Sequence, residues 1–463
     1  MPAALPRVPA ELPRVQKLPV EFARTGNFRT VSCPTVRPAR LALHSCAAAG
    51  QNQPMPSFVA VRPAPGLLAL PWQQPLEDWP ADIVVALPRG ISRHVVRFVR
   101  VDGTILACKE IAPPTALREH ALLRDLARLD VPSVTSVGVV RDRVDADGEP
   151  LDAILLTEHL AFSLPYRSVF SNAVREETAL RLVDALVALL VRLHLEGFYW
   201  GDCSLSNTLF RRDADAFAAY LVDAETGSLH DRLSDGQRTY DVDLARTNIF
   251  GELLDLQAGG GLSEDADALG LVDRLVARYE SLWHELTGVE EFGSGEMHRL
   301  QARVRRLNDL GFDVAELDIV TDFDGTTVRI QPKVVDAGHH ARRLLRLTGL
   351  DVEENQARRL LNDLDTFRVR TDQQNQDESI VAHQWLTDVF EPAVSTVPPH
   401  LRGKLDAAQL YHEILEHRWY ESERAGREVS LVDAVRSYAR DVLANRPDEE
   451  VALPQPGARI SDV

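Results

Sequence analysis

Three short runs rich in β-branched residues, placed close together between residues 82 and 111, restrict the fold more than any other feature. The runs read DIVVAL, HVVRFVR and TILACKEI. The loop PRGISR joins the first two, and Asp102-Gly103, which suits a tight hairpin turn, joins the last two. The pattern predicts three antiparallel strands.

A helical pattern and two further strand-like runs follow this hairpin. PPTALREHALLRDLARL places Pro before Thr115 as a cap and then apolar residues at helical spacing, which predicts a helix of about four turns over one face of the sheet. VTSVGVV and DAILLTEHL predict two more strands. The first half of the chain therefore forms a small, sheet-rich unit.

Beyond Val174 the chain becomes helical. EETALRLVDALVALLVRLHLEG predicts a long core helix, and Asp184 and Arg192 make it too polar to span a bilayer. The polar loop FYWGDCSLSNTLF comes next, followed by the strand-like AYLVDAET. The chain as a whole is predicted to be an α+β protein.

Lys109 stands on the same strand face as Ile105 and Ala107, because strand side chains alternate. Only four of the 51 basic residues are lysines, so a lysine kept on an apolar strand indicates a need for a compact point charge. The alternative is a lysine whose ammonium reaches solvent from the strand end.

The segment LHLEGFYWGDCSLSNTLF, with YLVDAETG after it, resembles the catalytic and metal-binding loops of the protein-kinase-like superfamily. The form is that of lipopolysaccharide (Kdo) kinases and small-molecule phosphotransferases. The stretch from about 57 to 445 resembles a bacterial family in which this region is fused to a C-terminal domain of unknown function. The resemblance implies a two-lobed kinase fold that uses ATP and Mg²⁺.

The resemblance also assigns roles to individual residues. Asp202 matches the aspartate that orients and deprotonates the acceptor hydroxyl, and Asn207 and Asp223 match the metal ligands. Lys109 would hold the nucleotide phosphates, with Glu119 as its partner. The nucleotide-binding candidates are Gly90, Lys109, Glu119 and Glu158.

Several positions depart from the kinase pattern. Only Gly90 marks the loop that is usually glycine-rich, so Ser92 and Arg93 are candidates to hold phosphate with their side chains. Trp200 replaces the usual histidine, and the metal loop reads DAE. The predicted helix TYDVDLARTNIFGELLDL stands where a protein kinase carries its activation segment, which argues against a protein acceptor.

Purely structural interpretations remain open for several of these residues. Asp202 and Asn207 also suit an ordinary polar turn, and Glu119 also suits a solvent-facing helix position. Cys203 has no histidine near it in sequence and is interpreted as a buried thiol, not a nucleophile. Glu225 is interpreted as structural.

The predicted domain organisation has five parts. They are residues 1–56, a disordered or mis-annotated N-terminal extension; 57–160, the kinase-like N-lobe; 161–290, the kinase-like C-lobe; 291–445, a mainly helical domain; and 446–463, a flexible tail. The extension is basic and rich in Pro and Ala, and one hypothesis places the true start of translation at Met55.

The C-terminal domain is predicted to contain a helix over 295–311, a hairpin around Asp324-Gly325, and a helix with Asp351 and Glu354 as a capping box. GHHARRLLRL gathers basic side chains that suit either a phosphate or acidic partner or, as favoured here, a solvated helix face. A protein partner of this domain is one hypothesis.

Charge and cysteine content exclude some classes of function. The formal charge of -18 disfavours binding to nucleic acid or anionic membrane. The four scattered cysteines predict reduced thiols and a cytoplasmic location.

Two functions compete: an ATP- and Mg²⁺-dependent phosphotransferase acting on a small molecule, sugar or glycolipid, and an inactive nucleotide-binding module that recruits a partner. Nucleotide transfer onto a protein is a distant third.

Overall fold

A computed structural model describes residues 56–60, 64–87, 93–169, 176–288, 290–293, 299, 302, 312–321 and 327–449. Within these ranges the protein is a mixed helix and sheet structure. Gly90 and Ser92, the helix predicted over 295–311 apart from two of its residues, and nearly all of both predicted terminal segments lie outside the described residues.

A six-stranded antiparallel sheet forms the first unit, in the order β1-β5-β8-β4-β3-β2. Its strands are β1 (Ser57–Ala60), β2 (Val84–Val85), β3 (Val96–Val101), β4 (Thr104–Ile111), β5 (Ser136–Arg141) and β8 (Ala153–Glu158). The strands predicted from the sequence are present, although β2 is shorter than DIVVAL. A small ribbon, β6 (Arg143–Val144) with β7 (Pro150–Leu151), extends from β5.

The β3–β4 hairpin turns at Asp102 and Gly103, both of which have positive φ (48° and 86°). This is the backbone that an Asp-Gly hairpin turn requires, so the prediction is confirmed. Because side chains of a strand alternate, Leu106 and Cys108 of β4 pack on one face of the sheet and Ile111 packs on the opposite face. Lys109 lies on the same face as Ile111.

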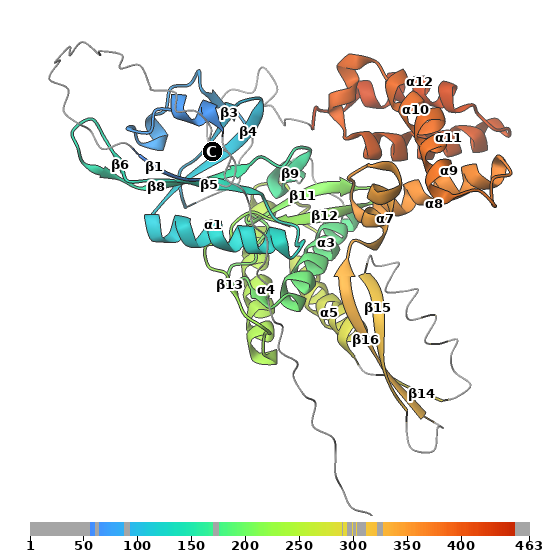
Figure 1. Cartoon of the computed structure of the whole chain (residues 1–463), viewed down its shortest axis with the longest axis horizontal. Coiled ribbons are helices and arrows are strands. Elements are labelled where there is room, and N and C mark those ends of the chain that lie inside the picture. Colours follow the sequence, from blue (N-terminus) through green and yellow to red (C-terminus); the bar gives the residue numbers. More distant parts are fainter. Residues whose placement is uncertain are drawn as a thin grey trace, which may run out of the picture. The chain divides into compact units, whose positions relative to one another are not determined.

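Helix α1 (Pro113–Arg128) packs against β5 and β8, as the apolar spacing predicts (Figure 1). Its cap differs from the prediction: the N-cap residue is Ala112, with no side-chain hydrogen bond, and Thr115 lies inside the helix. The reason is that proline has no N–H to satisfy and a φ already suited to helix, so the helix begins at Pro113 itself.

The second unit combines helices with short strands. It contains β9 (Ser163–Pro165), α2 (Tyr166–Val169), α3 (Glu176–Leu195), β10 (Phe198–Tyr199), β11 (Thr208–Asp213), β12 (Ala216–Leu221), β13 (Ser228–Leu229), α4 (Asp235–Ala258) and α5 (Ala268–Thr287). β11 and β12 form a hairpin, and β9 pairs with β11. The long helices α3 and α4 were predicted, whereas β9 and β11 were not.

The C-terminal unit starts with a three-stranded sheet, in the order β14-β16-β15, and continues as helices (Figure 1). The elements are β14 (Glu290–Gly293), β15 (Phe312–Thr321), β16 (Thr327–Ala337), α7 (His339–Thr348), α8 (Glu354–Arg370), α9 (Glu378–Trp385), α10 (Glu391–Thr396), α11 (Ala407–Ala425) and α12 (Leu431–Asp441). The pairing of β15 with β16 confirms the predicted hairpin, whose turn lies outside the described residues.

The predicted capping box of α8 is wrong by two residues. The N-cap is Glu353, whose N–H donates to Gln356 Oε1 at 3.3 Å, and not Asp351. Asp213 of the distant β11 also accepts from the Gln356 N–H at 2.7 Å. A tertiary contact therefore supplies the acceptor that sequence analysis sought locally.

Three groups of buried apolar side chains hold these units together. One lies on the outer face of the six-stranded sheet and includes Trp72 and Trp79. The largest joins α1, α3, α4 and α5, and a third lies within α7–α12. The C-terminal helices therefore have a core of their own. In the part of the chain that the structure describes, no helix is both long and apolar enough to cross a bilayer.

Candidate active site

A cavity of about 440 Å³ is lined by the six-stranded sheet on one side and by the segments that follow α3 on the other. Its apolar lining includes Val96, Phe98, Ala107, Leu209 and Val222. Six residues singled out in the sequence also line it: Arg93, Lys109, Glu158, Asp202, Asn207 and Asp223. The cavity therefore brings together side chains that are more than a hundred positions apart.

Lys109 lies at the centre of a carboxylate cluster. Its Nζ is 2.7 Å from Asp223 Oδ2, and 3.1 Å from both Glu119 Oε2 and Glu225 Oε2. The Lys109 side chain is only 13% exposed and that of Glu119 is fully buried. The alternative in which the Lys109 ammonium reaches solvent is therefore wrong. The alternative in which Glu119 faces solvent is wrong as well.

The charges of this cluster shift one another's protonation. Burial disfavours the charged form of Lys109, but Glu119 and Asp223 outweigh it and hold the pKa of the ammonium above its ordinary value. Burial, reinforced by the charge of Asp223, raises the pKa of Glu119 to about 7 although Lys109 opposes it. The cations of the cluster are Lys109 and the Arg93 guanidinium that contacts Glu225, so three ionised carboxylates exceed them by one charge. This excess suits the binding of a further cation.

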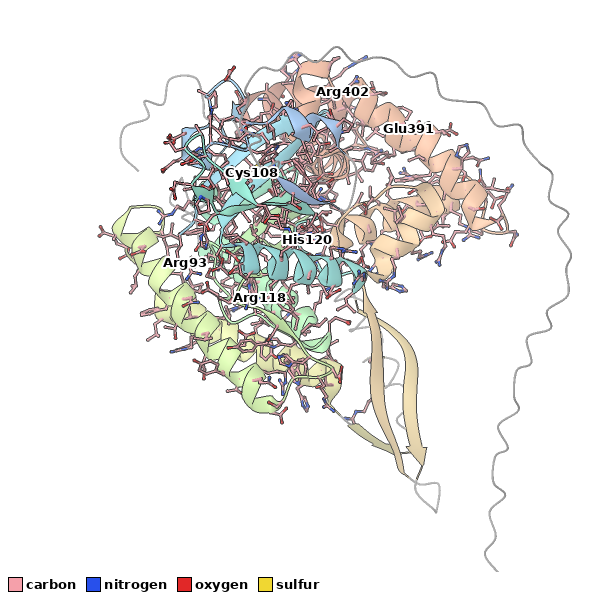
Figure 2. The ribbon with its side chains drawn as sticks, turned by 60° about the vertical axis from the view of Figure 1, so that its left-hand side comes forward. Arg93, Cys108, Arg118, His120, Glu391 and Arg402 are labelled. Carbon is pink, nitrogen blue, oxygen red and sulfur yellow. The ribbon has the colours of Figure 1, made fainter. Side chains whose placement is uncertain are left out.

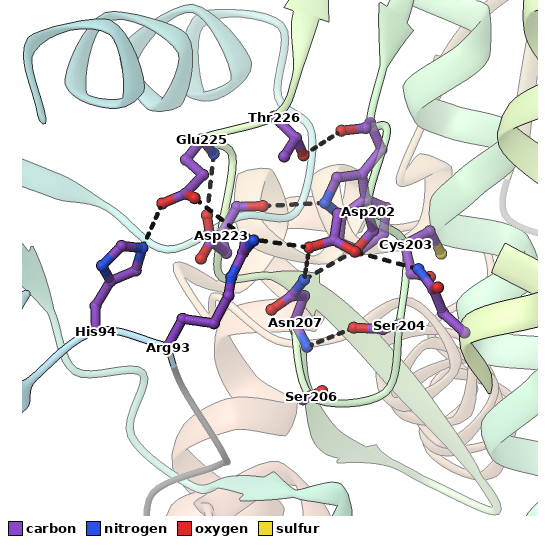
Figure 3. Close-up of polar contacts among 12 residues, drawn as sticks. Arg93, His94, Asp202, Cys203, Ser204, Ser206, Asn207, Asp223, Glu225 and Thr226 are labelled. Carbon is purple, nitrogen blue, oxygen red and sulfur yellow. Dashed lines mark hydrogen bonds and ion pairs between the residues drawn. The ribbon is translucent and has the colours of Figure 1, made fainter. Parts of the chain in front are cut away.

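Glu225 belongs to this cluster, which the sequence analysis missed by interpreting it as structural. Beyond Lys109, its carboxylate contacts His94 Nε2 at 3.0 Å and Arg93 at 3.1 Å (Figure 3). Arg118, which is labelled in Figure 2 and belongs to α1, donates to the Glu225 backbone oxygen. The sequence Asp-Ala-Glu at 223–225 could have predicted this contact, because a side chain two positions after Asp223 lies on the same face of an extended chain.

Asn207 and Asp202 contact each other across the polar loop. Asn207 Nδ2 donates to Asp202 O at 2.9 Å and to Asp202 Oδ2 at 3.1 Å (Figure 3). This orientation uses the amide nitrogen for Asp202, so the amide oxygen is the atom that could ligate a metal ion. With the Asp223 carboxylate, it forms the kind of hard-oxygen donor set that Mg²⁺ prefers, so the residues fit that ion.

Arg93 completes the polar wall of the cavity. It lies 3.7 Å from Asp202, and its side chain is 69% exposed. The sequence analysis named Arg93 as a substitute for the missing glycines, and Arg93 lines the cavity from the loop that precedes β3. Gly90, the remaining loop candidate, is not among the described residues.

Helix α4 fixes the polar loop through hydrogen bonds to its backbone. The buried Asp241 accepts from Trp200 N at 2.7 Å and from Gly201 N at 2.8 Å, and it lies 3.0 Å from His194 Nε2. Gly201 has φ 77°, which suits glycine. Burial is the largest influence on His194 and lowers its pKa. Sequence analysis did not find this network.

Two further α4 side chains reach the loop about two and three turns after Asp241. Asn248 Nδ2 donates to Asp202 Oδ1 at 3.1 Å, and so orients the carboxylate. Glu252 accepts from Leu205 N at 2.6 Å and from Ser206 N at 3.0 Å, and burial raises its pKa. The spacing of 241, 248 and 252 places all three on one helix face, a signal that was visible in the sequence.

Trp200, which replaces the usual histidine, is fully buried. Its Nε1 donates to the backbone oxygen of Asp223 at 3.0 Å, so the indole connects the polar loop to the loop that contains Asp223.

Cys203, in the same polar loop, is also fully buried, and burial raises the pKa of its thiol well above the ordinary value. A thiol in this state is no nucleophile, as the sequence analysis expected.

The basic residues of α7 do not form an open phosphate site. His340 Nδ1 lies 2.6 Å from Glu354, and Arg343 pairs with Glu378. Their acidic partners therefore lie within the same unit. Of the helix face predicted to be solvated, Arg346 is exposed, whereas His339, His340, Arg342 and Arg343 are half-buried.

Two family models match separate parts of the chain. The model of the "Lipopolysaccharide kinase (Kdo/WaaP) family" matches residues 104–249, and that of "Domain of unknown function (DUF4032)" matches residues 281–443. A search of curated proteins found no match. Among solved structures, "WaaP in complex with acyl carrier protein" is 17% identical, covers 55% of this chain and 99% of that chain, and gives a TM-score of 0.33. The chain therefore contains one region that matches the lipopolysaccharide kinase (Kdo/WaaP) family model and a second region that matches the DUF4032 model.

Proposed function

We propose that this protein is an ATP- and Mg²⁺-dependent phosphotransferase whose acceptor is a hydroxyl of a small molecule, sugar or glycolipid. The observation that carries the proposal is the meeting of Lys109, Asp202, Asn207 and Asp223 on one cavity of about 440 Å³. In this proposal the six-stranded sheet and the helices after it act as the two lobes of a kinase-like fold.

Each side chain has a task that its contacts support. Lys109 binds the nucleotide phosphates, and its buried partner Glu119 fixes the direction of the ammonium. Glu158, at the end of β8, lines the part of the cavity where the nucleotide would contact the six-stranded sheet. Asn207 and Asp223 would hold Mg²⁺, which when bound neutralises charge on the phosphates.

Asp202 accepts the proton of the acceptor hydroxyl in this proposal. Its side chain is 36% exposed, so an acceptor reaches it from solvent. Asn207 and Asn248 each donate to one of its oxygens and thereby fix the carboxylate plane. Positioning of this kind, together with cations on the phosphates, is the larger part of phosphoryl-transfer catalysis.

The small size of the acceptor is supported by α4. This helix begins at Asp235, soon after Asp223, and Asn248 and Glu252 of the helix line the cavity beside Asp202. Only residues 224–234 lie between Asp223 and this helix, and their strand β13 is paired with β10, so little chain remains on which a protein acceptor would dock. The buried, unpaired Cys108 and Cys203 support a cytoplasmic location for the proposed enzyme.

Binding and turnover are tested separately on the full chain. We expect ATP with Mg²⁺ at 100 times its dissociation constant to stabilise the protein by about 2.7 kcal/mol in a thermal-shift measurement. Asp202→Ala retains this shift and loses phosphate transfer by about 10²-fold or more, because a general base is removed. The exposed Glu264→Ala variant serves as the control.

The outcomes separate the two functions. No stabilisation of the wild-type protein by ATP with Mg²⁺ would contradict both. Stabilisation without phosphate transfer to water or to any hydroxyl acceptor in a cell extract would instead support the inactive nucleotide-binding module.

A further inference from the structure

We infer that the DUF4032 region positions the two candidate Mg²⁺ ligands by gripping the β11–β12 hairpin, an inference that rests on the proposed function. The hairpin connects these ligands directly. β11 begins one residue after Asn207, and β12 ends two residues before Asp223. Val222 N also donates to Asn207 O at 3.1 Å, so the hairpin register fixes the spacing of the two side chains.

The turn of this hairpin is held from outside. Ala214, the first of its two turn residues, has φ 56°, a conformation that favours glycine and persists in other residues only when the surroundings impose it. Gln409 of α11 supplies that constraint. Its Oε1 accepts from Ala214 N at 3.0 Å, and its Nε2 donates to Ala214 O at 3.3 Å.

The residues before the turn are gripped by α8. Asp213 is buried, and its two oxygens accept from Gln356 N at 2.7 Å and from Asn355 Nδ2 at 2.8 Å. Gln356 Nε2 returns a bond to Arg212 O at 2.9 Å. Asp213 thus serves as a capping acceptor for a helix of another region, which couples the position of the hairpin to that of α8.

Ion pairs extend the grip along both strands. Arg211 lies 2.8 Å from Glu353, to which Tyr220 of β12 also donates at 2.7 Å. Arg212 forms a two-pronged contact with Glu449 at 2.9 and 3.0 Å. Gln356, Gln409 and Glu449 are all buried, as a permanent contact requires.

Gln409 and Gln356 are therefore positioning residues of the candidate site, although neither touches the cavity. The test compares Gln409→Ala with Tyr411→Phe in the full chain. Tyr411 lies on the same helix, and its hydroxyl donates to Asp363 at 2.7 Å within the C-terminal helices. Both variants lose hydrogen bonds in the same region, but only the first releases the hairpin.

Hydrogen exchange measured by mass spectrometry is the first measurement. We expect peptides spanning 202–208 and 221–225 to exchange at least about fivefold faster in Gln409→Ala, because both hydrogen bonds to Ala214 are lost, and at the wild-type rate in Tyr411→Phe. Wild-type rates in Gln409→Ala, or equal acceleration in both variants, would overturn the inference. If Gln409→Ala does not fold, Gln409→Glu replaces it, because it keeps the acceptor for Ala214 N and loses the donor to Ala214 O.

Mg²⁺ dependence of ATP turnover is the second measurement. We expect the apparent KM for Mg²⁺ to rise about fivefold in Gln409→Ala with a smaller change in kcat, and to stay unchanged in Tyr411→Phe. An unchanged KM in Gln409→Ala would overturn the inference even if exchange is faster. A wild-type protein without turnover would contradict the proposed function, and hydrogen exchange alone would then decide whether the grip exists.

Discussion

Two buried polar clusters of this protein use the same residue types to different ends. Around Lys109, one ammonium meets the carboxylates of Glu119, Asp223 and Glu225. At the junction between the β11–β12 hairpin and the C-terminal helices, each carboxylate has its own basic or N–H partner, as in the Arg212–Glu449 and Arg211–Glu353 pairs.

The difference teaches how a binding site is told from a structural contact. A cluster whose charges are matched has no need of a ligand and serves as a fixed joint. A cluster with carboxylates in excess stays electrostatically incomplete until further cations arrive. The following predictions, in order of decreasing effect, test this distinction.

Removal of the Lys109 ammonium has the largest expected effect. Lys109→Met leaves the exposed Arg93 on Glu225 as the remaining cation beside three carboxylates. We expect the free energy of unfolding to fall by about 3–5 kcal/mol, because the buried charges of Glu119 and Asp223 lose their partner. Added Mg²⁺ restores part of the loss by taking the place of the ammonium. Chemical denaturation with and without Mg²⁺ measures both.

The control for this prediction is Arg246→Met, which breaks the exposed pair with Asp273 and costs less than about 1 kcal/mol. A Lys109→Met protein as stable as the wild type, or one indifferent to Mg²⁺, would show that the cluster is not an incomplete cation site.

The junction gives a pH dependence through Asp213. Burial raises the pKa of Asp213 to about 6, against the bonds from Gln356 and Asn355 that lower it. Because the folded protein then binds this proton more tightly than the unfolded chain, stability from this group falls as pH rises from about 4 to about 6. The fall amounts to about 3 kcal/mol.

Asp213→Asn removes this titration, so we expect the difference in unfolding free energy between wild type and variant to change across that window and to be constant above it. The exposed Asp265→Asn variant is the control. A wild-type curve parallel to that of Asp213→Asn from pH 4 to 6 would disprove the assignment.

Charge matching at the junction predicts a partial rescue. Arg212→Met leaves Glu449, 5% exposed, without its partner and lowers the unfolding free energy by about 2 kcal/mol. Adding Glu449→Leu removes the unpaired charge and recovers most of the loss. A double variant less stable than Arg212→Met would show that the pair itself, and not its matching, stabilises the joint.

The smallest expected effect concerns Trp200. Trp200→Phe keeps most of the apolar volume and removes the hydrogen bond to Asp223 O, which should lower the melting temperature by an amount corresponding to about 1 kcal/mol. A loss several times larger would indicate that the indole has a further role in the metal loop.

Much of the local structure was predictable from the sequence. The hairpin at Asp102-Gly103, the face of β4 that carries Lys109, and the helices α3 and α4 follow from turn chemistry and periodicity, which act between near neighbours in the chain. The contacts of Asp241, Asn248 and Glu252 were missed, because a polar residue on a helix has the same appearance whether it meets water or a distant backbone N–H.

The sequence by itself determined which candidate site residues exist and how they are spaced, since the five-residue step from Asp202 to Asn207 and the strand position of Lys109 depend on local geometry. Only the tertiary structure decided that Glu225 joins the Lys109 cluster and that Asp213 caps α8. Those choices depend on packing between segments more than a hundred residues apart, where hydrogen-bond partners are selected by burial and not by chain order.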